Sequence, residues 1–372
     1  MTVIGISGSY GGLNMGDEAI LTSAVAQLRA TVPDVEIVVF SRNAEHTRRH
    51  HAVNRVVSPR EALRDEILPE VERLDLLLLG GGGILYDTEA HVYLREARIA
   101  QARGVPTFAY AIGIGPLADL EERRAVRDGL NRMAGITVRE VGAKRLLEEV
   151  GVERPITVTA DPALLLEPEP FTEEMLRREG IPEDGPLVAM SVREKGGAAP
   201  ELTHAAYHRL LADAADFITH RFGARIVFVP MERSDFREAH RVVAEMTAPE
   251  RAHVLREHYR PGQVLGLMRH FEMAVGMRLH FLIFAAVTGV PLIALPYASK
   301  VMDLIESLGL PRRMATQDDR AGYLLGDLDR LWDEREAQRD LLRERVPPLQ
   351  ELARRTTPLA AQLVGHRPEL VA

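Results

Sequence analysis

The feature that most constrains the fold is a regular alternation between short apolar, β-rich runs and longer segments with helical periodicity. Such alternation is typical of βαβ units, in which a helix crosses over the sheet to the next parallel strand. Residues 74–79, LDLLLL, do not alternate between apolar and polar, so a strand there should be buried on both faces. The predicted strands are 3–7, 36–40, 55–58, 74–79, 107–112, 135–139, 156–159, 187–192, 225–230, 254–256, 273–275 and 292–295. The sequence therefore predicts an α/β protein with largely parallel sheets.

The length of the chain indicates two domains, because 372 residues exceed what one hydrophobic core usually supports. Residues 166–174, LEPEPFTEE, combine prolines with acidic residues and interrupt the alternation, so we assign them as an interdomain linker. We expect one Rossmann-like domain over residues 1–165, a second over residues 175–345, and a C-terminal helix over residues 346–372. Two such domains facing across a cleft, the GT-B-like arrangement, is the simplest architecture.

Composition excludes several classes of protein. A formal net charge of −8 argues against a nucleic-acid-binding surface. The absence of cysteine excludes disulfides, thiol catalysis and thiolate metal sites. The N-terminus runs directly into a strand and the apolar runs are much shorter than a bilayer span, so we expect a cytoplasmic protein; peripheral contact with the inner face of a membrane stays open. No metal-ligand spacing is found, so neither a metal nor another cofactor is required, and histidines such as His50 and His51 are expected at the surface.

Residues 274–300 carry the strongest indication of a binding site. They read as two successive strand-to-helix junctions, and each junction bears cationic or titratable side chains. In a parallel sheet both junctions lie at the carboxyl edge, where α/β sheets bind ligands and helix N-termini favour anions. Arg278, His280 and Lys300 are therefore predicted to converge on one anionic ligand, with phosphate the leading candidate. His280 could instead be a structural histidine, but its position two residues after Arg278 favours a functional role.

Glycine-rich loops predict a second binding face. Residues 5–18 form a loop between a strand and a helix, where the backbone can closely approach a ligand. This loop lacks the lysine of a P-loop and the spacing of a dinucleotide fingerprint. Asp17 either only caps the helix or caps it and also serves acceptor hydroxyls, and the sequence leaves both interpretations open. The glycine run 80–83 and the turn 113–115 follow later strands at the same edge.

Two further arginines, Arg139 and Arg193, end predicted strands. An arginine on an apolar strand is costly unless its guanidinium meets solvent or an anion. Each could form a salt bridge with the adjacent helix, or each could point into the cleft between the domains.

Several of these motifs occur in a fixed order over residues 5–305. They are Asn14-x-Gly16-Asp17-Glu18-Ala19, Gly80–Gly83, Gly113-x-Gly115-Pro116, Val138-Arg139, Asp161-Pro162-Ala163, Gly276-Met277-Arg278-Leu279-His280 and Tyr297-x-x-Lys300. Together they resemble the polysaccharide pyruvyl transferase family, most closely its CsaB-like members, which attach pyruvate ketals to cell-wall polysaccharide. Residues 84–89 and 111–112 depart from the pattern expected of those members. Both departures lie on the acceptor side, so they bear on the acceptor sugar and leave the donor site intact.

The resemblance implies a GT-B-like fold, phosphoenolpyruvate as donor, and a sugar or lipid-linked glycan as acceptor. The residues it implies for phosphoenolpyruvate are Arg139, Arg193, Arg278, Leu279, His280 and Lys300. Catalysis is expected from His280, Arg278, Lys300 and Asp17. We place the acceptor against Gly11, Gly12, Asn14, Asp17, Glu18, Gly81, Gly82, Gly83 and Asp87.

The implied reaction joins the pyruvyl group to two sugar hydroxyls as a ketal and releases phosphate. His280 would contact the phosphate and donate a proton, Arg278 and Lys300 would stabilise the departing phosphate, and Asp17 or Asp87 would orient the acceptor hydroxyls. A nucleotide-sugar glycosyltransferase of GT-B fold is the main alternative, although the paired glutamates of retaining enzymes are absent from residues 277–288. A non-catalytic sugar-binding relative is a second alternative.

Overall fold

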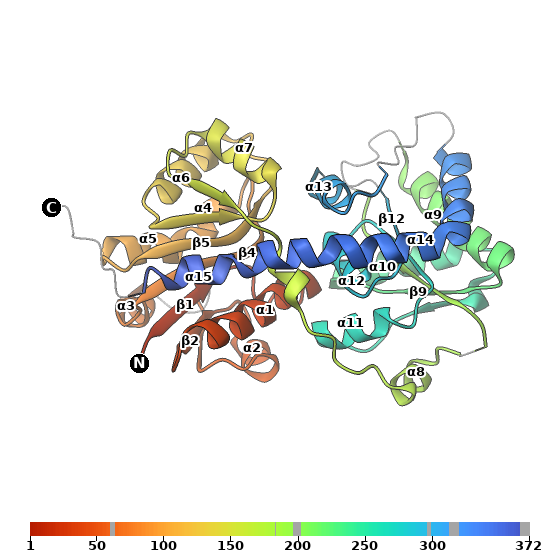
Figure 1. The fold of residues 1–372 in the computed structure, drawn as a ribbon, viewed down its shortest axis with the longest axis horizontal. Helices are drawn as coiled ribbons and strands as arrows, with labels where there is room; N and C mark the ends of the chain where they lie inside the picture. The colour runs from red at the N-terminus through yellow and green to blue at the C-terminus, as the bar shows by residue number, and fades with distance from the viewer. Residues whose placement is uncertain (60–63, 183, 196–201, 296–298, 312–319, 365–372) are drawn as a thin grey trace. The chain divides into compact units, whose positions relative to one another are not determined.

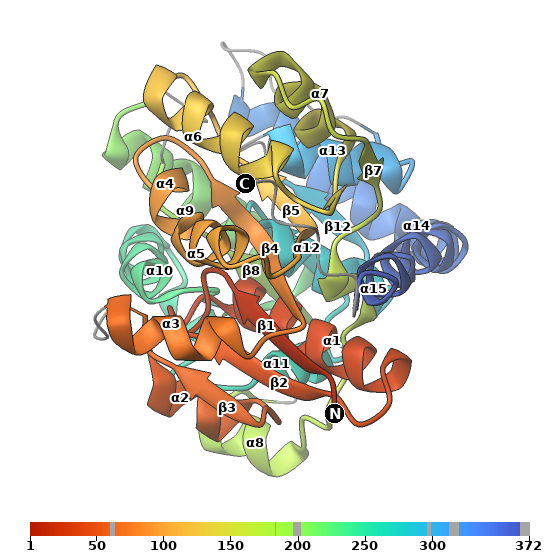
Figure 2. The same ribbon diagram turned by 90° about the vertical axis from the view of Figure 1, so that its left-hand side faces the viewer.

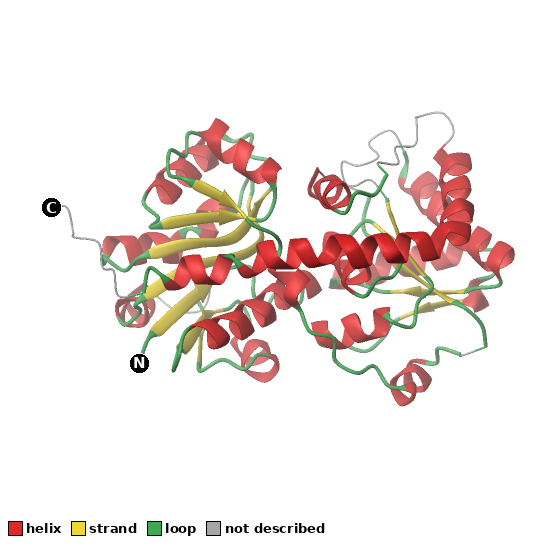
Figure 3. Cartoon of the chain, viewed as in Figure 1, coloured by secondary structure: helices red, strands yellow, loops and turns green. Residues whose placement is uncertain are grey.

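The computed structural model describes residues 1–59, 64–182, 184–195, 202–295, 299–311 and 320–364. The chain divides into two compact units, one comprising Met1–Leu166 with Leu349–Ala372 and the other Glu167–Pro348. Each unit contains one parallel sheet with helices on its faces (Figures 1 and 3). This confirms the predicted α/β class. The first unit is built from two separate pieces of chain, so most of the predicted C-terminal segment belongs to it.

The first unit is organised around a seven-stranded sheet in the order β3-β2-β1-β4-β5-β6-β7, with all neighbours parallel. Its strands are β1 (Val3–Ser7), β2 (Glu36–Phe40), β3 (Arg55–Val57), β4 (Leu76–Leu85), β5 (Thr107–Ile114), β6 (Gly135–Val138) and β7 (Ile156–Val158). Its helices are α1 (Met15–Thr31), α2 (Ala44–His50), α3 (Arg64–Glu72), α4 (Ala90–Tyr93), α5 (Arg95–Ala102), α6 (Leu120–Asn131), α7 (Val141–Val150), the 3₁₀ turn η1 (Pro162–Leu165) and α15 (Thr356–Ala361). The strand order reverses between β1 and β4, the position at which such sheets bind ligands.

Two apolar layers cover the faces of this sheet. Leu77 and Leu79 of β4 pack with α3, α5, α6 and α7, whereas Leu76 and Leu78 pack with α1 and α15. Figure 2 shows α1 and α5 on opposite sides of the sheet. All four leucines are fully buried, which confirms the prediction of a strand enclosed on both faces.

The second unit contains a five-stranded parallel sheet in the order β10-β9-β8-β11-β12. Its strands are β8 (Leu187–Ser191), β9 (Arg225–Phe228), β10 (Ala252–Val254), β11 (Met273–Gly276) and β12 (Leu292–Ala294). Its helices are α8 (Glu173–Glu179), α9 (His204–Phe222), α10 (Arg233–Glu245), η3 (Pro249–Arg251), α11 (Pro261–Met268), α12 (Leu279–Val287), α13 (Ser299–Ser307) and α14 (Arg320–Arg354), which continues into the first unit. Helices α9, α10 and the start of α14 build one core with the sheet. Helix α12 is almost entirely apolar and accordingly buried.

Strand β4 extends further than predicted. Residues 80–83 were expected to form a loop, but they continue the strand and pair with β5. A Cβ atom on Gly81 would lie 2.0 Å from Cγ2 of Ile20, and one on Gly80 would lie 2.4 Å from Oη of Tyr10. The glycines therefore allow α1 and the loop before it to pack directly on the strand.

The segment predicted as a linker is largely packed onto the second unit. The backbone N–H of Glu169 donates to the carbonyl of Gly262 at 2.8 Å. Phe171 is buried, and its ring centroid lies 4.9 Å from that of Tyr259. A Cβ atom on Gly266 would lie 1.9 Å from the carbonyl oxygen of Glu169, so a glycine in α11 is what permits this close approach.

Helix α14 crosses the boundary predicted between residues 345 and 346. It contains Pro347 and Pro348 within its 35 residues. Proline removes backbone hydrogen bonds and usually ends or kinks a helix. Buried side chains on both sides, Val346 and Ala353 among them, hold this helix in place across the prolines, so tertiary packing overrides the local preference.

Candidate functional site

The carboxyl edge of the five-stranded sheet holds the residues predicted for the donor. Arg193 follows β8, Arg278 is the N-cap residue of α12 after β11, and His280 lies in the first turn of that helix. Lys300 lies in the first turn of α13, after β12. Because β8, β11 and β12 are adjacent and parallel, their carboxyl ends share one edge. His280 and Lys300 are both half-buried there.

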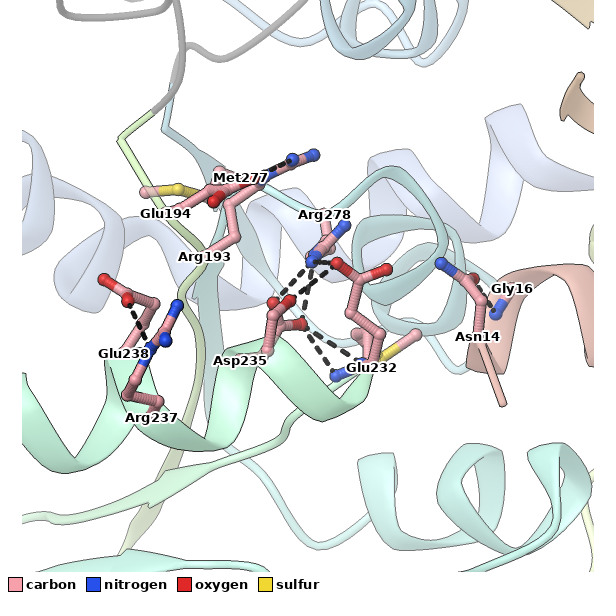
Figure 4. Close-up of polar contacts among 12 residues, drawn as sticks. Asn14, Gly16, Arg193, Glu194, Glu232, Asp235, Arg237, Glu238, Met277 and Arg278 are labelled. Carbon is pink, nitrogen blue, oxygen red and sulfur yellow. Dashed lines mark hydrogen bonds and ion pairs between the residues drawn. The ribbon is translucent and has the colours of Figure 1, made fainter. Parts of the chain in front are cut away.

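Arg278 is enclosed by two carboxylates from the β9–α10 junction (Figure 4). Its Nε donates to Oδ2 of Asp235 at 3.0 Å, and its Nη2 donates to Oδ1 of Asp235 and Oε1 of Glu232. The side chain of Asp235 is fully buried, that of Arg278 is 11% exposed and that of Glu232 is 30% exposed. Burial opposes the charge on Arg278, but the two carboxylates outweigh it and raise the pKa of the guanidinium. Burial also raises the pKa of Asp235 by more than Arg278 lowers it.

The carboxylate pair changes what Arg278 can do. The sequence predicted an arginine open to a phosphate, whereas here its guanidinium is engaged by two acids. Asp235 also accepts from the backbone N–H groups of Met231 at 3.0 Å and Glu232 at 3.3 Å, so it is fixed in its loop. Glu232 is the more exposed of the two acids, and its negative charge would compete with an anion that approaches Arg278.

Tyr207 on α9 ties together the ends of β8 and β11. Its hydroxyl donates to the backbone carbonyl of Arg193 at 2.8 Å and lies 2.8 Å from Sδ of Met277. The side chain of Arg193 is 16% exposed, with Nη2 lying 3.6 Å from Oε1 of Glu194 (Figure 4). Leu279 is buried, so its predicted contact with the donor would have to come from the backbone.

At the corresponding edge of the first unit, Asn14 is the N-cap residue of α1. Its Oδ1 accepts from the N–H groups of Gly16 at 3.0 Å and Asp17 at 3.3 Å. The interpretation of Asp17 as the helix cap is therefore wrong, because Asp17 lies in the first turn. Its Oδ1 lies 2.5 Å from the position of a Cβ on Gly82, so the carboxylate is held against the backbone of β4. Its predicted role toward acceptor hydroxyls stays a prediction.

Glu18 braces the glycine-rich loop from inside the protein. It is 4% exposed. Its Oε1 accepts from the N–H of Gly11 at 2.9 Å, and its Oε2 lies 2.7 Å from Nε2 of His51. His51 is itself buried, contrary to the expectation of a surface histidine. Because both carboxylate oxygens are engaged within the protein, Glu18 positions Gly11.

The remaining predicted acceptor residues also have contacts within the first unit. Gly11 has φ +74°, and a Cβ on it would lie 2.3 Å from Oγ of Ser41. Gly81 and Gly82 are buried and Gly83 is half-buried. The carboxylate oxygens of Asp87 accept from the backbone N–H groups of residues 118 and 119, both at 2.9 Å, so Asp87 supports the loop before α6.

Arg139 belongs to the first unit and lies in a closed ion-pair cluster. Its Nη1 donates to Oδ2 of Asp161 at 2.8 Å and its Nε to Oε2 of Glu140 at 2.9 Å. Its side chain is 2% exposed. Burial opposes the charge most strongly, but Glu140 and Asp161 together outweigh it and raise the pKa of Arg139. Of the two alternatives considered from the sequence, the surroundings of Arg139 therefore match the salt bridge.

Sequence reasoning missed three charged residues at these edges. Arg42 follows β2 much as Arg139 follows β6, so a search for arginines at strand ends would have found it. Glu232 and Asp235 form a capping box at the start of α10, a local signal that is readable in the sequence. Their pairing with Arg278, across 43 or more positions of the chain, had no such signal.

Two negative findings apply to the residues that the structure describes. Among them, no group of three or more histidine or acidic side chains could hold a metal ion. In the same residues no helix is both long enough and apolar enough to cross a bilayer.

Comparison with solved structures gives the fold. The chain is similar to an MnaA–UDP structure from S. aureus, with 11% identity, 99% of each chain covered and a TM-score of 0.68. It is similar to a putative UDP-N-acetylglucosamine 2-epimerase from Listeria monocytogenes, with 14% identity, 99% of this chain and 98% of that chain covered, and a TM-score of 0.64. It also resembles the ADP-heptose lps heptosyltransferase II from E. coli, with 14% identity, 90% of this chain and 100% of that chain covered, and a TM-score of 0.54. These neighbours are GT-B-like glycosyltransferases and epimerases, which confirms the predicted fold class.

Comparison of the sequence gives the family. No curated protein matches it significantly. The family described as polysaccharide pyruvyl transferase matches residues 14–299, well over half of the chain. That range begins within the first glycine-rich loop, and it contains the glycine run 80–83, the turn 113–115 and the Arg278–His280 junction of the second unit. The chain therefore belongs to the polysaccharide pyruvyl transferase family.

Proposed function

We propose that the protein transfers the pyruvyl group of phosphoenolpyruvate to two hydroxyls of a sugar in a polysaccharide or its lipid-linked precursor. The product is a cyclic ketal, and inorganic phosphate is released. Family membership supports a transferase that acts on a glycan. The choice of phosphoenolpyruvate as donor is our proposal.

One observation carries the proposal: four cationic or titratable side chains follow three adjacent parallel strands. These are Arg193 after β8, Arg278 and His280 after β11, and Lys300 after β12. Phosphoenolpyruvate carries a carboxylate and a phosphate, and such a set offers donors for both groups. The N-termini of α12 and α13 lie at the same edge and favour negative charge.

The proposed chemistry balances without a redox step. A proton is added to C3 of the enol, positive charge develops at C2, and one sugar hydroxyl attacks C2. The bond from C2 to the phosphate oxygen breaks, and the second hydroxyl then closes the ring. Of the two hydroxyl protons lost, one is balanced by the proton gained at C3 and the other leaves with the phosphate.

Each residue has a stated part in this proposal. His280 contacts the phosphate and donates the proton, and Lys300 stabilises the leaving phosphate. Arg278 joins Lys300 once the donor has displaced Glu232. Asp17 orients or deprotonates the acceptor, since the oxygens of Asp87 are already engaged by backbone N–H groups. Arg139 is assigned to the framework of the first unit because Asp161 and Glu140 enclose it.

The test is calorimetric titration of the full chain with phosphoenolpyruvate, alongside UDP as the competing ligand, followed by phosphate release with a glycan lipid extract. We expect phosphoenolpyruvate to bind and UDP not to bind. His280→Ala and Lys300→Ala should each abolish phosphate release while the melting temperature is retained. The exposed His240 and the half-buried Lys144, which lies 3.8 Å from Glu148 in the first unit, provide matched controls as alanine variants, which should keep full activity. Binding of UDP alone, or near-normal turnover in both site variants, would refute the proposal.

A further inference from the structure

A cluster in the first unit that is not among the predicted site residues combines an arginine with two tyrosines. Arg42 follows β2, Ser9 follows β1 and Tyr86 follows β4, while Tyr93 ends α4. Strands β2, β1 and β4 are adjacent and parallel, so these residues share the carboxyl edge at which the strand order reverses. Ligands of open α/β sheets bind at this position.

Ser9 links Arg42 to Tyr93 by hydrogen bonds, and the ring of Tyr93 in turn contacts Tyr86. Nη2 of Arg42 donates to Oγ of Ser9 at 2.5 Å and to its carbonyl at 3.3 Å. The hydroxyl of Tyr93 donates to the same Oγ at 3.3 Å. The ring centroids of Tyr86 and Tyr93 lie 6.4 Å apart with a 54° tilt. Burial and Tyr93 raise the pKa of Tyr86 to about 12, and Arg42 acts in the opposite direction, which places its charge near that phenol.

The charge of Arg42 is balanced differently from that of the other strand-end arginines. Arg139 and Arg278 each pair with two carboxylates. Within the described residues, Arg42 forms no ion pair with a carboxylate, and its hydrogen bonds go to the hydroxyl and carbonyl of Ser9. Its Nε is shielded from solvent and bonds to no atom of that part of the chain. Arg42 is half-buried, and the part of its guanidinium that is shielded from solvent is costly without a counter-ion unless a ligand supplies the anion.

The backbone beside Arg42 is shaped for close approach. A Cβ atom on Gly12 would lie 2.5 Å from Nη2 of Arg42, so any larger residue there would displace the guanidinium. A Cβ atom on Gly115 would likewise lie 2.7 Å from Cβ of Tyr86. Gly12 and Gly115 thus make room for Arg42 and for Tyr86.

We infer that Arg42, Ser9, Tyr86 and Tyr93 form an acceptor subsite for a sugar that bears an anionic group. The guanidinium binds the anion, either a carboxylate or a phosphate attached to the sugar, and the half-exposed Tyr86 offers an aromatic face and a hydroxyl to the ring. Arg42 and Tyr86 therefore determine specificity for the acceptor. This inference rests on the proposed function, because it names the class of acceptor in that reaction.

Direct binding tests the subsite without requiring turnover. The full chain is titrated with glucose 1-phosphate, glucuronate and glucose as probes, and separately with phosphoenolpyruvate. We expect at least one anionic sugar to bind about tenfold or more tighter than glucose. The phosphate and carboxylate probes then distinguish the two sources of the anion. Equal affinity for glucose, or no binding of either anionic sugar, overturns the inference.

Variants separate recognition from structural support. Arg42→Gln should abolish the preference for the anionic probe, Arg42→Lys should retain part of it, and Tyr86→Ala should weaken all three sugars, while phosphoenolpyruvate binding stays unchanged. Ser9→Ala removes the hydroxyl that accepts from Arg42 but leaves the guanidinium, so this variant should keep the preference for the anionic sugar. It therefore tests the subsite even if Arg42→Gln folds poorly. The assignment is contradicted if folded Arg42→Gln still prefers the anionic sugar. It is also contradicted if folded Ser9→Ala loses this preference while Arg42→Gln keeps it. If the anionic sugars bind but phosphoenolpyruvate does not, the proposed donor is refuted and the inference about this subsite is retained.

Discussion

The carboxylates around Arg278 lead to opposite expectations for two conservative substitutions. Asp235 is fully buried and accepts from Arg278 and from two backbone N–H groups. Asp235→Asn keeps the shape but removes the charge and one acceptor oxygen, leaving Arg278 poorly compensated in a buried position. Breaking a buried ion pair from one side costs about 3–5 kcal/mol. We expect a loss of that size in the free energy of unfolding and a loss of at least about tenfold in affinity for phosphoenolpyruvate, because Arg278 is no longer held in place.

Glu232→Gln is the matched control on the same guanidinium. Its side chain is 30% exposed, so the change in stability should stay within about 1 kcal/mol. The substitution removes the anion that competes with the donor, so phosphoenolpyruvate should bind about three- to tenfold tighter. Urea denaturation and calorimetric titration of both variants provide the measurements. The reasoning is refuted if Asp235→Asn unfolds and binds like the parent chain, or if Glu232→Gln weakens binding.

Three further predictions follow from contacts described by the structure. Burial is the largest single influence on Glu179 and raises its pKa, but hydrogen bonds from His253, Tyr259 and the N–H groups of residues 256 and 257 together outweigh it and lower the pKa from 4.5 to about 2. Its contribution, about 3 kcal/mol, should be fully present above pH about 4.5 and lost as the pH falls toward about 2; unfolding titrations of Glu179→Gln should lack this dependence. Gly81→Ala should destabilise the chain by about 1–3 kcal/mol through its clash with Ile20, whereas Gly326→Ala, with nothing within 4 Å, should stabilise α14 by up to about 1 kcal/mol in thermal unfolding. Tyr207→Phe should lower the free energy of unfolding by about 1 kcal/mol. It should also lower kcat/KM in the fraction of protein that stays folded, because the hydroxyl that joins the ends of β8 and β11 is lost; unchanged kinetics would argue against that role.

The fold could be predicted from local signals, because a short apolar run in the sequence marks each strand. All twelve predicted strands are present, with ends that differ by a few residues. The glycine run after β4 was misjudged because glycine favours loops locally. It is a strand here because Ile20 and Tyr10, distant in sequence, occupy the space that side chains would need. Proline likewise ends helices locally, yet α14 continues through Pro347, with buried side chains before and after it along the helix.

The positions of the candidate site residues could be predicted better than their partners. Sequence order and parallel topology were sufficient to place Arg278, His280 and Lys300 at one sheet edge. They could not indicate that Asp235 would reach Arg278, because ion pairs between distant segments leave no periodic pattern. The same holds for Glu18 and His51, which are 33 positions apart and share a buried hydrogen bond.

The last helix of the first unit, α15, follows the whole second unit in the sequence, and this order affects how the protein folds during synthesis. The hydroxyls of Tyr110 and Thr357 lie 2.6 Å apart, and Thr356 donates to Thr159 at 2.9 Å, all in buried surroundings. During translation α1 can already cover part of this face of the sheet, but the part that α15 covers, over β5 and β6, stays uncovered until the segment after residue 349 has left the ribosome. A nascent or truncated chain that stops short of that point presents bare apolar surface around Phe108 and Tyr110, so it should depend on chaperones where the finished protein does not.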